Sequence, residues 1–160
     1  MTNGNETNKR FKLHAIRLLK VNVVELSIRS NVPPDESLGI NEIDIPFKVG
    51  HSEFDEKSRQ IDVAVGIHIN DEESDSDEAI SEPPFFLNVA VHGEFHIGEE
   101  FPDEHITDWA RRNAPLILMP FVREHVYALT VRSGFKPLIL PLFEVPTLAV
   151  DLTQAGESSP

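Results

Sequence analysis

The sequence has 160 residues, 40% of them hydrophobic, which is enough for one ordinary hydrophobic core. Its 27 acidic residues against 14 basic ones give a net charge of -13, which disfavours nucleic acid as a partner because phosphates bind clustered lysine and arginine. The absence of cysteine excludes disulfides, thiolate metal sites and a cysteine nucleophile. No apolar stretch reaches the roughly 20 residues of a membrane span, and the polar N-terminus has no signal-peptide pattern, so we expect a cytoplasmic protein.

Polar segments delimit one expected domain and two tails. Residues 1–10 and 154–160 lack periodicity and apolar bulk, so we expect both to be disordered. Residues 11–153 then form a single domain. Within it, the run 71–82 carries seven acidic residues and no basic one, which predicts a solvated loop between two strands. This loop contains no glycine and lacks the spacing of a calcium-binding EF-hand.

The first predicted element is a long strand over residues 11–29. Its apolar residues change phase along the segment, which indicates a strand interrupted by bulges. Both faces carry apolar side chains, so we expect helices to cover one face and a partner or client the other. The next segment, 30–40, contains Pro33, Pro34 and Gly39 and is predicted to be an irregular crossover.

Three further segments alternate between apolar and polar residues, which is the pattern of strands with one buried face. They cover residues 43–49, 61–69 and 85–97. Pro46 in the first of them predicts an edge strand or a bulge, because proline has no N–H to donate. The second and third flank the acidic run and predict an antiparallel hairpin with a long acidic tip.

The C-terminal third has helical patterns. Residues 101–112 predict a short helix, with acidic residues near its start and arginines near its end. A longer helix should follow, with Pro120 either opening or kinking it and Gly134 just past its end. One stripe of this longer helix is apolar and consists of Leu118, Val122, Val126 and Leu129. A last short helix is predicted from Pro146 to about Thr153, which completes an α+β layout of four strands followed by helices.

Few residues suggest catalysis or metal binding. The chain has no G-x-S-x-G motif, no glycine-rich phosphate loop and no H-E-x-x-H motif. His92, Glu94 and His96 project from one face of a predicted strand, where they could share a zinc ion. The exposed face of a strand produces the same pattern without any metal, with His68 as a neighbour. We therefore expect no cofactor and no enzyme, and we keep a zinc-binding module or enzyme as an alternative.

The segment 137–150 is more apolar than a C-terminal connection requires. A small domain that exposes such a patch normally uses it for binding. Core packing, contacts between subunits and binding of a client are three explanations that the residues themselves leave open.

Residues 113–150 resemble the SecB family of protein-export chaperones. The shared pattern is a proline, an apolar stretch, Pro-aromatic-x-Arg-Glu, a helix, Ser/Gly-Phe and a proline-broken apolar segment. The residues that fit this pattern are Pro115, Pro120, Phe121, Arg123, Glu124, Arg132, Phe135, Leu138, Leu140 and Leu148. More loosely, the likeness extends over 11–152 and includes a hairpin that ends in G-x-F-x-I at Gly93, Phe95 and Ile97.

The resemblance implies a four-stranded antiparallel sheet followed by a long helix and a short C-terminal helix. It also implies a homotetramer, built as a dimer of dimers whose long helices pack between two sheets. The residues that we expect at the contacts between subunits are Phe121, Val122, Val126 and Leu129.

The resemblance further implies an ATP-independent chaperone, which binds unfolded preproteins in apolar grooves and keeps them competent for export by the Sec pathway. Many weak apolar contacts, each of about 1 kcal/mol, tolerate varied client sequences. The expected groove lining consists of Val32, Leu38, Ile40, Leu140, Leu142, Phe143, Val145 and Leu148.

One departure from the family concerns the SecA motor. Export chaperones of this family dock SecA through acidic residues on the exposed sheet face, and the positions that align here are Lys20, Val24 and Asn88. The sequence therefore leaves two hypotheses open: a general export chaperone that binds SecA, and a SecB-like chaperone dedicated to one partner, such as an antitoxin.

Overall fold

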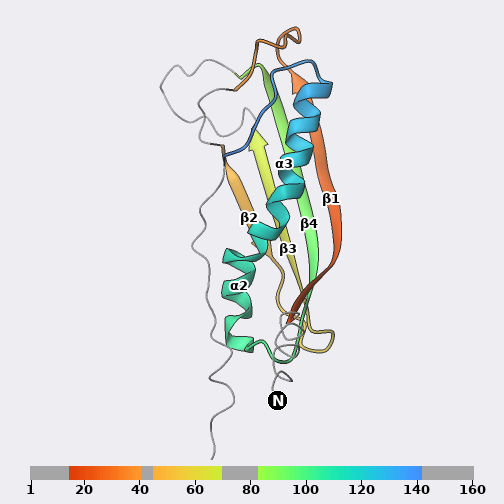
Figure 1. Cartoon of the computed structure of the whole chain (residues 1–160), viewed down its shortest axis with the longest axis vertical. Helices are drawn as coiled ribbons and strands as arrows, with labels where there is room; N and C mark the ends of the chain where they lie inside the picture. Colours follow the sequence, from red (N-terminus) through yellow and green to blue (C-terminus); the bar gives the residue numbers. More distant parts are fainter. Residues whose placement is uncertain (1–14, 41–44, 70–82, 142–160) are drawn as a thin grey trace, which may run out of the picture.

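The computed structural model describes residues 15–40, 45–69 and 83–141. Four strands form one antiparallel sheet, and the helices cover one of its faces (Figure 1). The strands are β1 (Ile16–Ser30), β2 (Phe47–His51), β3 (Gln60–Ile69) and β4 (Phe85–Ile97). Their order in the sheet is β1-β4-β3-β2, so β1 and β2 form the two edges. This arrangement confirms the predicted α+β class and its four-stranded antiparallel sheet.

The hairpin of β3 and β4 forms the centre of the sheet. The strands pair from Gln60 opposite His96 to Ile69 opposite Leu87, as the alternation predicted. The odd-numbered apolar residues of both strands are buried under the helices, because a period of two puts them all on one face. The acidic tip predicted for 71–82 lies outside the described residues.

The edge strands also follow their sequence patterns. β1 is one long strand with register shifts between Leu18 and Lys20 and between Val23 and Glu25, which confirms the predicted bulges. β2 lies at the sheet edge, as Pro46 predicted, although it begins one residue after that proline. The crossover after β1 contains no strand or helix in its described part, 31–40.

Three helical elements follow the sheet. They are the 3-10 turn η3 (Asp103–His105), α2 (Ile106–Arg112) and α3 (Ala114–Arg132). Pro115 occupies the first turn of α3, where a missing N–H costs nothing, and Pro120 lies inside the helix. Gly134 follows the helix with a φ of 80°, which confirms the predicted glycine beyond its end. No helix in the described part of the chain is long and apolar enough to cross a membrane.

The core lies between α3 and the sheet. Leu118, Val122 and Val126 of α3 are completely buried against β3 and β4. Two aromatic pairs extend this packing. The ring of Phe95 meets Trp109 of α2 edge-on at 5.1 Å. Near the other end of the sheet, the ring of Phe85 lies 5.0 Å from that of Phe135, just after α3.

Candidate functional site

The chain leaves α3 as an extended segment that lies along the helix. We call residues 138–141 of this segment the C-terminal strip. One end of the strip is held by the buried side chain of Thr130, whose Oγ1 accepts a hydrogen bond from the backbone N–H of Leu138 at 3.1 Å. At the other end, Nη2 of Arg123 donates to the carbonyl oxygen of Pro141 at 2.7 Å. The strip is therefore attached to α3 at both ends.

These two attachments set the direction of the side chains between them. Leu138 and Leu140 point inward and are each 5% exposed, whereas Ile139 is 77% exposed. Alternation of this kind is what an extended backbone produces. Ile139 is thus held in solvent by the burial of its two neighbours.

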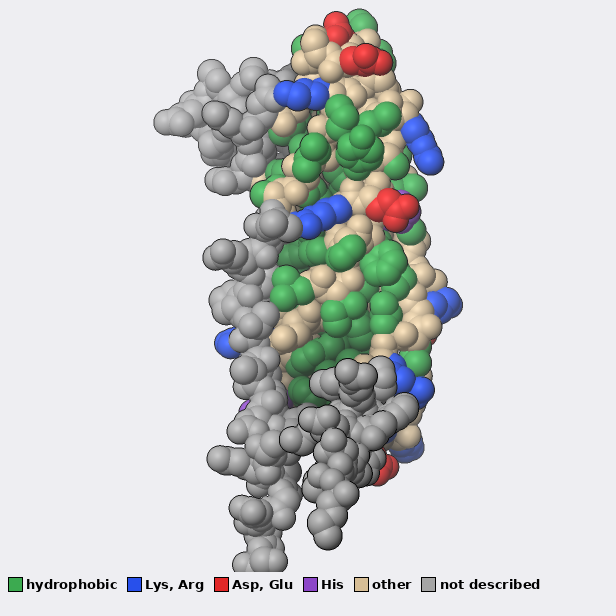
Figure 2. Space-filling view, viewed as in Figure 1, with side chains coloured by type: hydrophobic (Ala, Val, Ile, Leu, Met, Phe, Trp, Pro, Cys, Tyr) green, Lys and Arg blue, Asp and Glu red, His purple; other side chains and the backbone are tan. Residues whose placement is uncertain are grey.

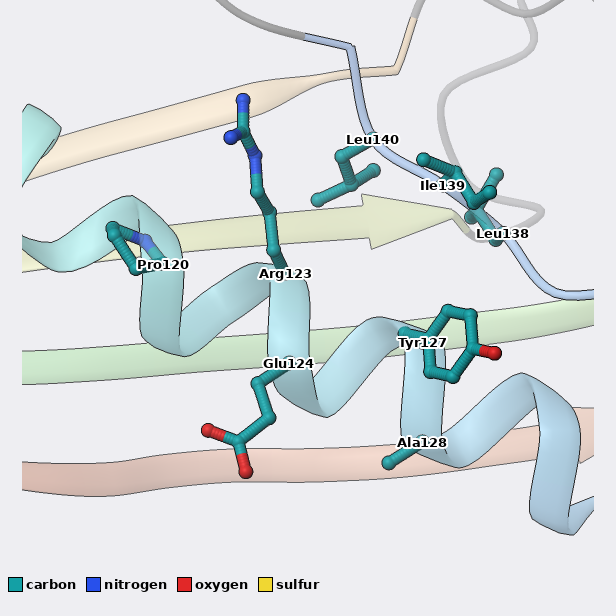
Figure 3. A pocket seen from close by; sticks show the side chains of 8 residues that line it. All are labelled: Pro120, Arg123, Glu124, Tyr127, Ala128, Leu138, Ile139 and Leu140. Atoms are coloured by element: carbon teal, nitrogen blue, oxygen red, sulfur yellow. The ribbon is translucent and has the colours of Figure 1, made fainter.

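A pocket of about 460 Å³ lies between α3 and the C-terminal strip (Figure 3). This volume is within the range of roughly 300 to 1,000 Å³ that is common for binding pockets. The residues that line it are Pro120, Arg123, Glu124, Tyr127, Ala128, Leu138, Ile139 and Leu140. Most of these side chains are apolar, so the pocket suits apolar side chains of a ligand.

The crossover lies beside the beginning of the strip. The backbone N–H of Lys136 donates to the carbonyl oxygen of Leu38 at 2.8 Å, which joins the two segments. Leu38 and Val32 are 40% and 39% exposed, and Ile40 is partly buried. The crossover therefore adds exposed apolar side chains next to the segment that leads into the strip.

A tight turn within the crossover is stabilised by Asp35. Its Oδ1 accepts hydrogen bonds from the Ser37 hydroxyl at 2.7 Å and from the Ser37 backbone N–H at 2.8 Å. These two bonds favour the ionised form and lower the pKa of the Asp35 carboxyl. The turn precedes Leu38 and so helps to place it.

Hydrophobic side chains are numerous on the helix-covered face of the molecule, and only a few charged groups interrupt them (Figure 2). The outer surface of α3 contributes Ile117, Tyr127 and Val131, which are all exposed. Exposed apolar side chains in such number on one face are a feature of binding surfaces.

The structure modifies the predicted groove lining. Val32 and Leu38 are exposed. Leu140 lines the pocket but is buried, because it packs in the hydrophobic core. Ile139, which was not among the predicted residues, is the most exposed side chain of the strip. Its alternation with the flanking leucines is a signal that sequence reasoning could have used. Four predicted residues lie outside the described part of the chain, as does the short helix expected after Pro146: Leu142, Phe143, Val145 and Leu148.

The residues predicted to join subunits divide into two groups. Val122 and Val126 lie on the side of α3 that packs against the sheet, and both are completely buried in the core of the protomer. Phe121 and Leu129 are partly buried and pack against the edge of that core. The most regular apolar stripe of α3 thus faces the sheet of its own protomer.

The histidines of the hairpin lie on the face of the sheet that no helix covers. Nε2 of His92 is 3.7 Å from a carboxylate oxygen of Asp62, and Nδ1 of His68 is 3.2 Å from Oδ1 of Asn88. Among the described residues, no three His, Asp or Glu side chains are close enough together to hold a metal ion. His92, Glu94 and His96 therefore follow one another along β4 without converging, and the zinc hypothesis gains no support.

None of the three positions that align with the family's acidic SecA contacts carries an acidic side chain. Lys20 pairs with Glu94 across the sheet, and Asn88 contacts a histidine on the same open face. Val24 lies at a bulge of β1 and is 65% exposed. Carboxylates do lie nearby on the open face: Glu94 is opposite Lys20, Glu25 is 3.9 Å from His68, and Asp62 is 3.7 Å from His92. The acidic groups therefore occupy other positions than those that the resemblance implies.

Comparisons with known proteins agree with this architecture. A family model described as preprotein translocase subunit SecB matches residues 10–148. The protein-export protein SecB of Anaplasma phagocytophilum (strain HZ) is 31% identical over 120 residues, which are 72% of this chain and 71% of that protein. The protein-export protein SecB of Bartonella quintana (strain Toulouse) is 29% identical over 93 residues, 52% of this chain and 58% of that protein.

A solved structure shares the fold. It is that of a SecB-like chaperone of Mycobacterium tuberculosis in complex with a peptide from the HigA1 antitoxin. The superposition has a TM-score of 0.64 at 17% identity and covers 85% of this chain and 96% of that one. The family match, the curated relatives and the common fold lead to one conclusion: this chain belongs to the SecB family, which is a family of chaperones and not of enzymes.

Proposed function

We propose that this protein is an ATP-independent chaperone of the cytoplasm, which binds unfolded preproteins and keeps them competent for export by the Sec pathway. The observation that carries the proposal is the apolar pocket between α3 and the C-terminal strip, with Ile139 exposed at its rim. Val32 and Leu38 extend the apolar surface on the side of the crossover. Membership of the SecB family supports the same function.

Apolar contacts suffice for such binding. Covering one exposed aliphatic side chain contributes about 1 kcal/mol after ordering costs, so several contacts in a row give useful affinity without dependence on client sequence. We propose that the groove continues beyond the pocket along Leu142, Phe143, Val145 and Leu148. Binding of this kind is an equilibrium and needs neither ATP nor a cofactor.

The net charge of -13 supports a polypeptide client. A negative field attracts basic and unfolded chains and raises their rate of encounter. The same charge disfavours non-specific aggregation, which keeps a protein with exposed apolar side chains in solution.

Two surfaces suit the assembly of a homotetramer. The outer face of α3 presents Ile117, Phe121 and Val131, with Leu129 at its border. β1 is an edge strand, and it exposes four large apolar side chains: Leu19, Val23, Val24 and Leu26. Because edge strands pair readily with other strands, a second copy could cover β1 while α3 packs against another pair. Light scattering on the native protein should give a mass of four chains, and a monomer would contradict the proposed assembly.

A specific observation favours an alternative, a chaperone dedicated to one partner such as an antitoxin. The three positions that align with the family's acidic SecA contacts are occupied by Lys20, Val24 and Asn88, none of which is acidic. The M. tuberculosis chaperone with the same fold was solved with an antitoxin peptide. Purification from the native host separates the two hypotheses, since a dedicated chaperone should bring down a single small protein and an export chaperone many clients.

The central test is whether the protein delays aggregation of an unfolded, signal-bearing preprotein and whether it binds purified SecA. Delay of aggregation together with SecA binding would support the export function, and delay without SecA binding would favour the dedicated chaperone. The double variant Phe143→Asp with Leu148→Asp should weaken client retention and leave the sheet folded, as circular dichroism can show. Failure of the wild-type protein to delay aggregation of any client would remove the proposal.

A further inference from the structure

Arg123 has a donor that no described residue satisfies. Its Nη2 donates to the carbonyl oxygen of Pro141, whereas its Nε is buried and finds no acceptor in the described part of the chain. A buried donor without an acceptor is destabilising, and more so when it belongs to a charged group. Native proteins keep such groups rarely, so the Nε of Arg123 needs an explanation.

The surroundings of Arg123 restrict the acceptor. Arg123 lines the pocket between α3 and the C-terminal strip, and Figure 3 shows its side chain directed toward the strip, between Pro120 and Leu140. Glu124 also lines the pocket but points to another side of α3 in the same view. Its carboxylate forms no ion pair with Arg123, so the guanidinium is a donor group in a largely apolar wall.

Charge favours a neutral acceptor over an anionic one. The chain carries a net charge of -13, which disfavours the approach of a ligand carboxylate. A polypeptide offers a neutral acceptor at every residue in its main-chain carbonyl. The ligand that suits both the apolar walls and the guanidinium is thus an extended polypeptide with an apolar side chain next to an accessible carbonyl.

The two attachments of the strip show how this acceptor reaches Nε. The hydrogen bond from Leu138 to Thr130 is buried, whereas the bond from Arg123 to Pro141 lies at the surface. Surface hydrogen bonds open more readily because water can replace the lost partner. The bond from Arg123 to Pro141 can therefore open while the buried Leu138 and Leu140 stay in place, which frees Nη2 for another acceptor.

We propose that Arg123 binds the main-chain carbonyl of the client segment that occupies the pocket, in exchange for its bond to Pro141. The inference rests on the proposed function and adds to it a contact that does not depend on client sequence. Apolar side chains select the segments that bind, and Arg123 holds the backbone of any such segment. In the complex both Nε and Nη2 of Arg123 can donate, which removes the cost of the unsatisfied donor.

The test uses the full-length protein and a fluorescein-labelled, unstructured peptide rich in leucine and phenylalanine, with affinity measured by fluorescence anisotropy. Arg123→Lys keeps the charge and one donor for Pro141 but has no counterpart of the Nε–H. We expect it to bind about ten- to hundredfold more weakly, the loss of one charged hydrogen bond. Arg132→Lys, on the same helix but outside the pocket lining, is the matched control and should bind like the wild type.

A second measurement separates contact with the client from a role in folding. Replacing single peptide bonds of the ligand by esters weakens one carbonyl acceptor at a time. In the wild type, at least one ester position should lower the affinity more than in Arg123→Lys, because only the wild type has the Nε–H to lose. Equal ester effects in both proteins, or a loss of thermal stability in Arg123→Lys without a loss of affinity, would overturn the inference. Absence of peptide binding by the wild type would instead refute the proposed function itself.

Discussion

Gly93 of β4 and Leu118 of α3 fit together so closely that a Cβ atom on Gly93 would lie 2.7 Å from Cδ2 of Leu118. Both residues are buried, and Leu118 has no accessible surface at all. The absence of a side chain at Gly93 therefore sets how near α3 can approach the sheet. Because α3 lines the pocket and holds the C-terminal strip, this contact also positions the candidate site.

Gly93→Ala should consequently destabilise the protein by about 1 to 3 kcal/mol, the usual cost of overpacking a core. Urea unfolding followed by circular dichroism measures this difference. Gly50→Ala on β2 is the matched control, because no atom lies within 4 Å of a Cβ built there. Equal stability of the Gly93 variant and the wild type would mean that α3 can move away from the sheet without cost.

Thr130→Val should cost about 1 to 3 kcal/mol of stability, because it leaves the buried backbone N–H of Leu138 without an acceptor. Valine has nearly the shape of threonine, so the hydroxyl alone is tested. Thr130→Ser retains that hydroxyl and should recover much of the loss. Differential scanning calorimetry provides the comparison, and an unchanged melting temperature for Thr130→Val would show that the strip does not depend on this bond.

Ile139→Ser should weaken peptide binding and leave stability unchanged. The side chain is 77% exposed in the free protein, so folding gains little from it, whereas a bound client can cover it. Loss of about 1 kcal/mol of apolar contact corresponds to roughly fivefold in affinity. Val49→Ser changes an exposed apolar residue on β2 that does not line the pocket, and it should bind like the wild type. If both variants weakened binding equally, the client would not distinguish the pocket from the rest of the surface.

Val131→Asp should lower the mass measured by light scattering without unfolding the protomer, because Val131 is exposed on the outer face of α3. A buried charge is far more costly than an exposed one, so Val126→Asp in the core should abolish folding altogether. The pair distinguishes a subunit contact from a core contact on the same helix. An unchanged mass for Val131→Asp would exclude this part of α3 from the subunit interface.

The turn between β2 and β3 should make stability depend on acid pH. Asp55 accepts hydrogen bonds from the Ser58 hydroxyl and from the backbone N–H groups of Lys57 and Ser58, and these bonds lower the pKa of its carboxyl. A group whose pKa is lowered in the folded state stabilises that state above its unfolded pKa, near 3.9, and the stabilisation is lost as the pH falls through the folded pKa. The difference in stability between wild type and Asp55→Ala should therefore shrink on acidification below about pH 4. A difference that stays constant down to pH 2 would contradict the assigned role of the carboxylate.

Local patterns in the sequence were sufficient to predict most of the sheet. The alternation in 61–69 and 85–97 determined both the hairpin and its buried face, because a period of two is a property of each strand by itself. Phase changes in the first strand likewise predicted its bulges, since each bulge shifts the alternation by one residue. The position of Pro46 predicted the edge strand, because proline has no N–H to donate to a neighbouring strand.

The surface of the candidate site depended on contacts between distant residues. From the sequence, the apolar stripe of α3 with Val122 and Val126 could face its own sheet or a second subunit. The structure shows that it packs against β3 and β4 of its own sheet. Burial of Leu140 and exposure of Ile139 likewise follow from the attachment of the strip to Thr130 and Arg123. The sequence by itself thus determined the strands and their buried faces, which are local properties of the chain. Tertiary structure alone decided which apolar side chains remain exposed, because exposure depends on what the rest of the chain covers.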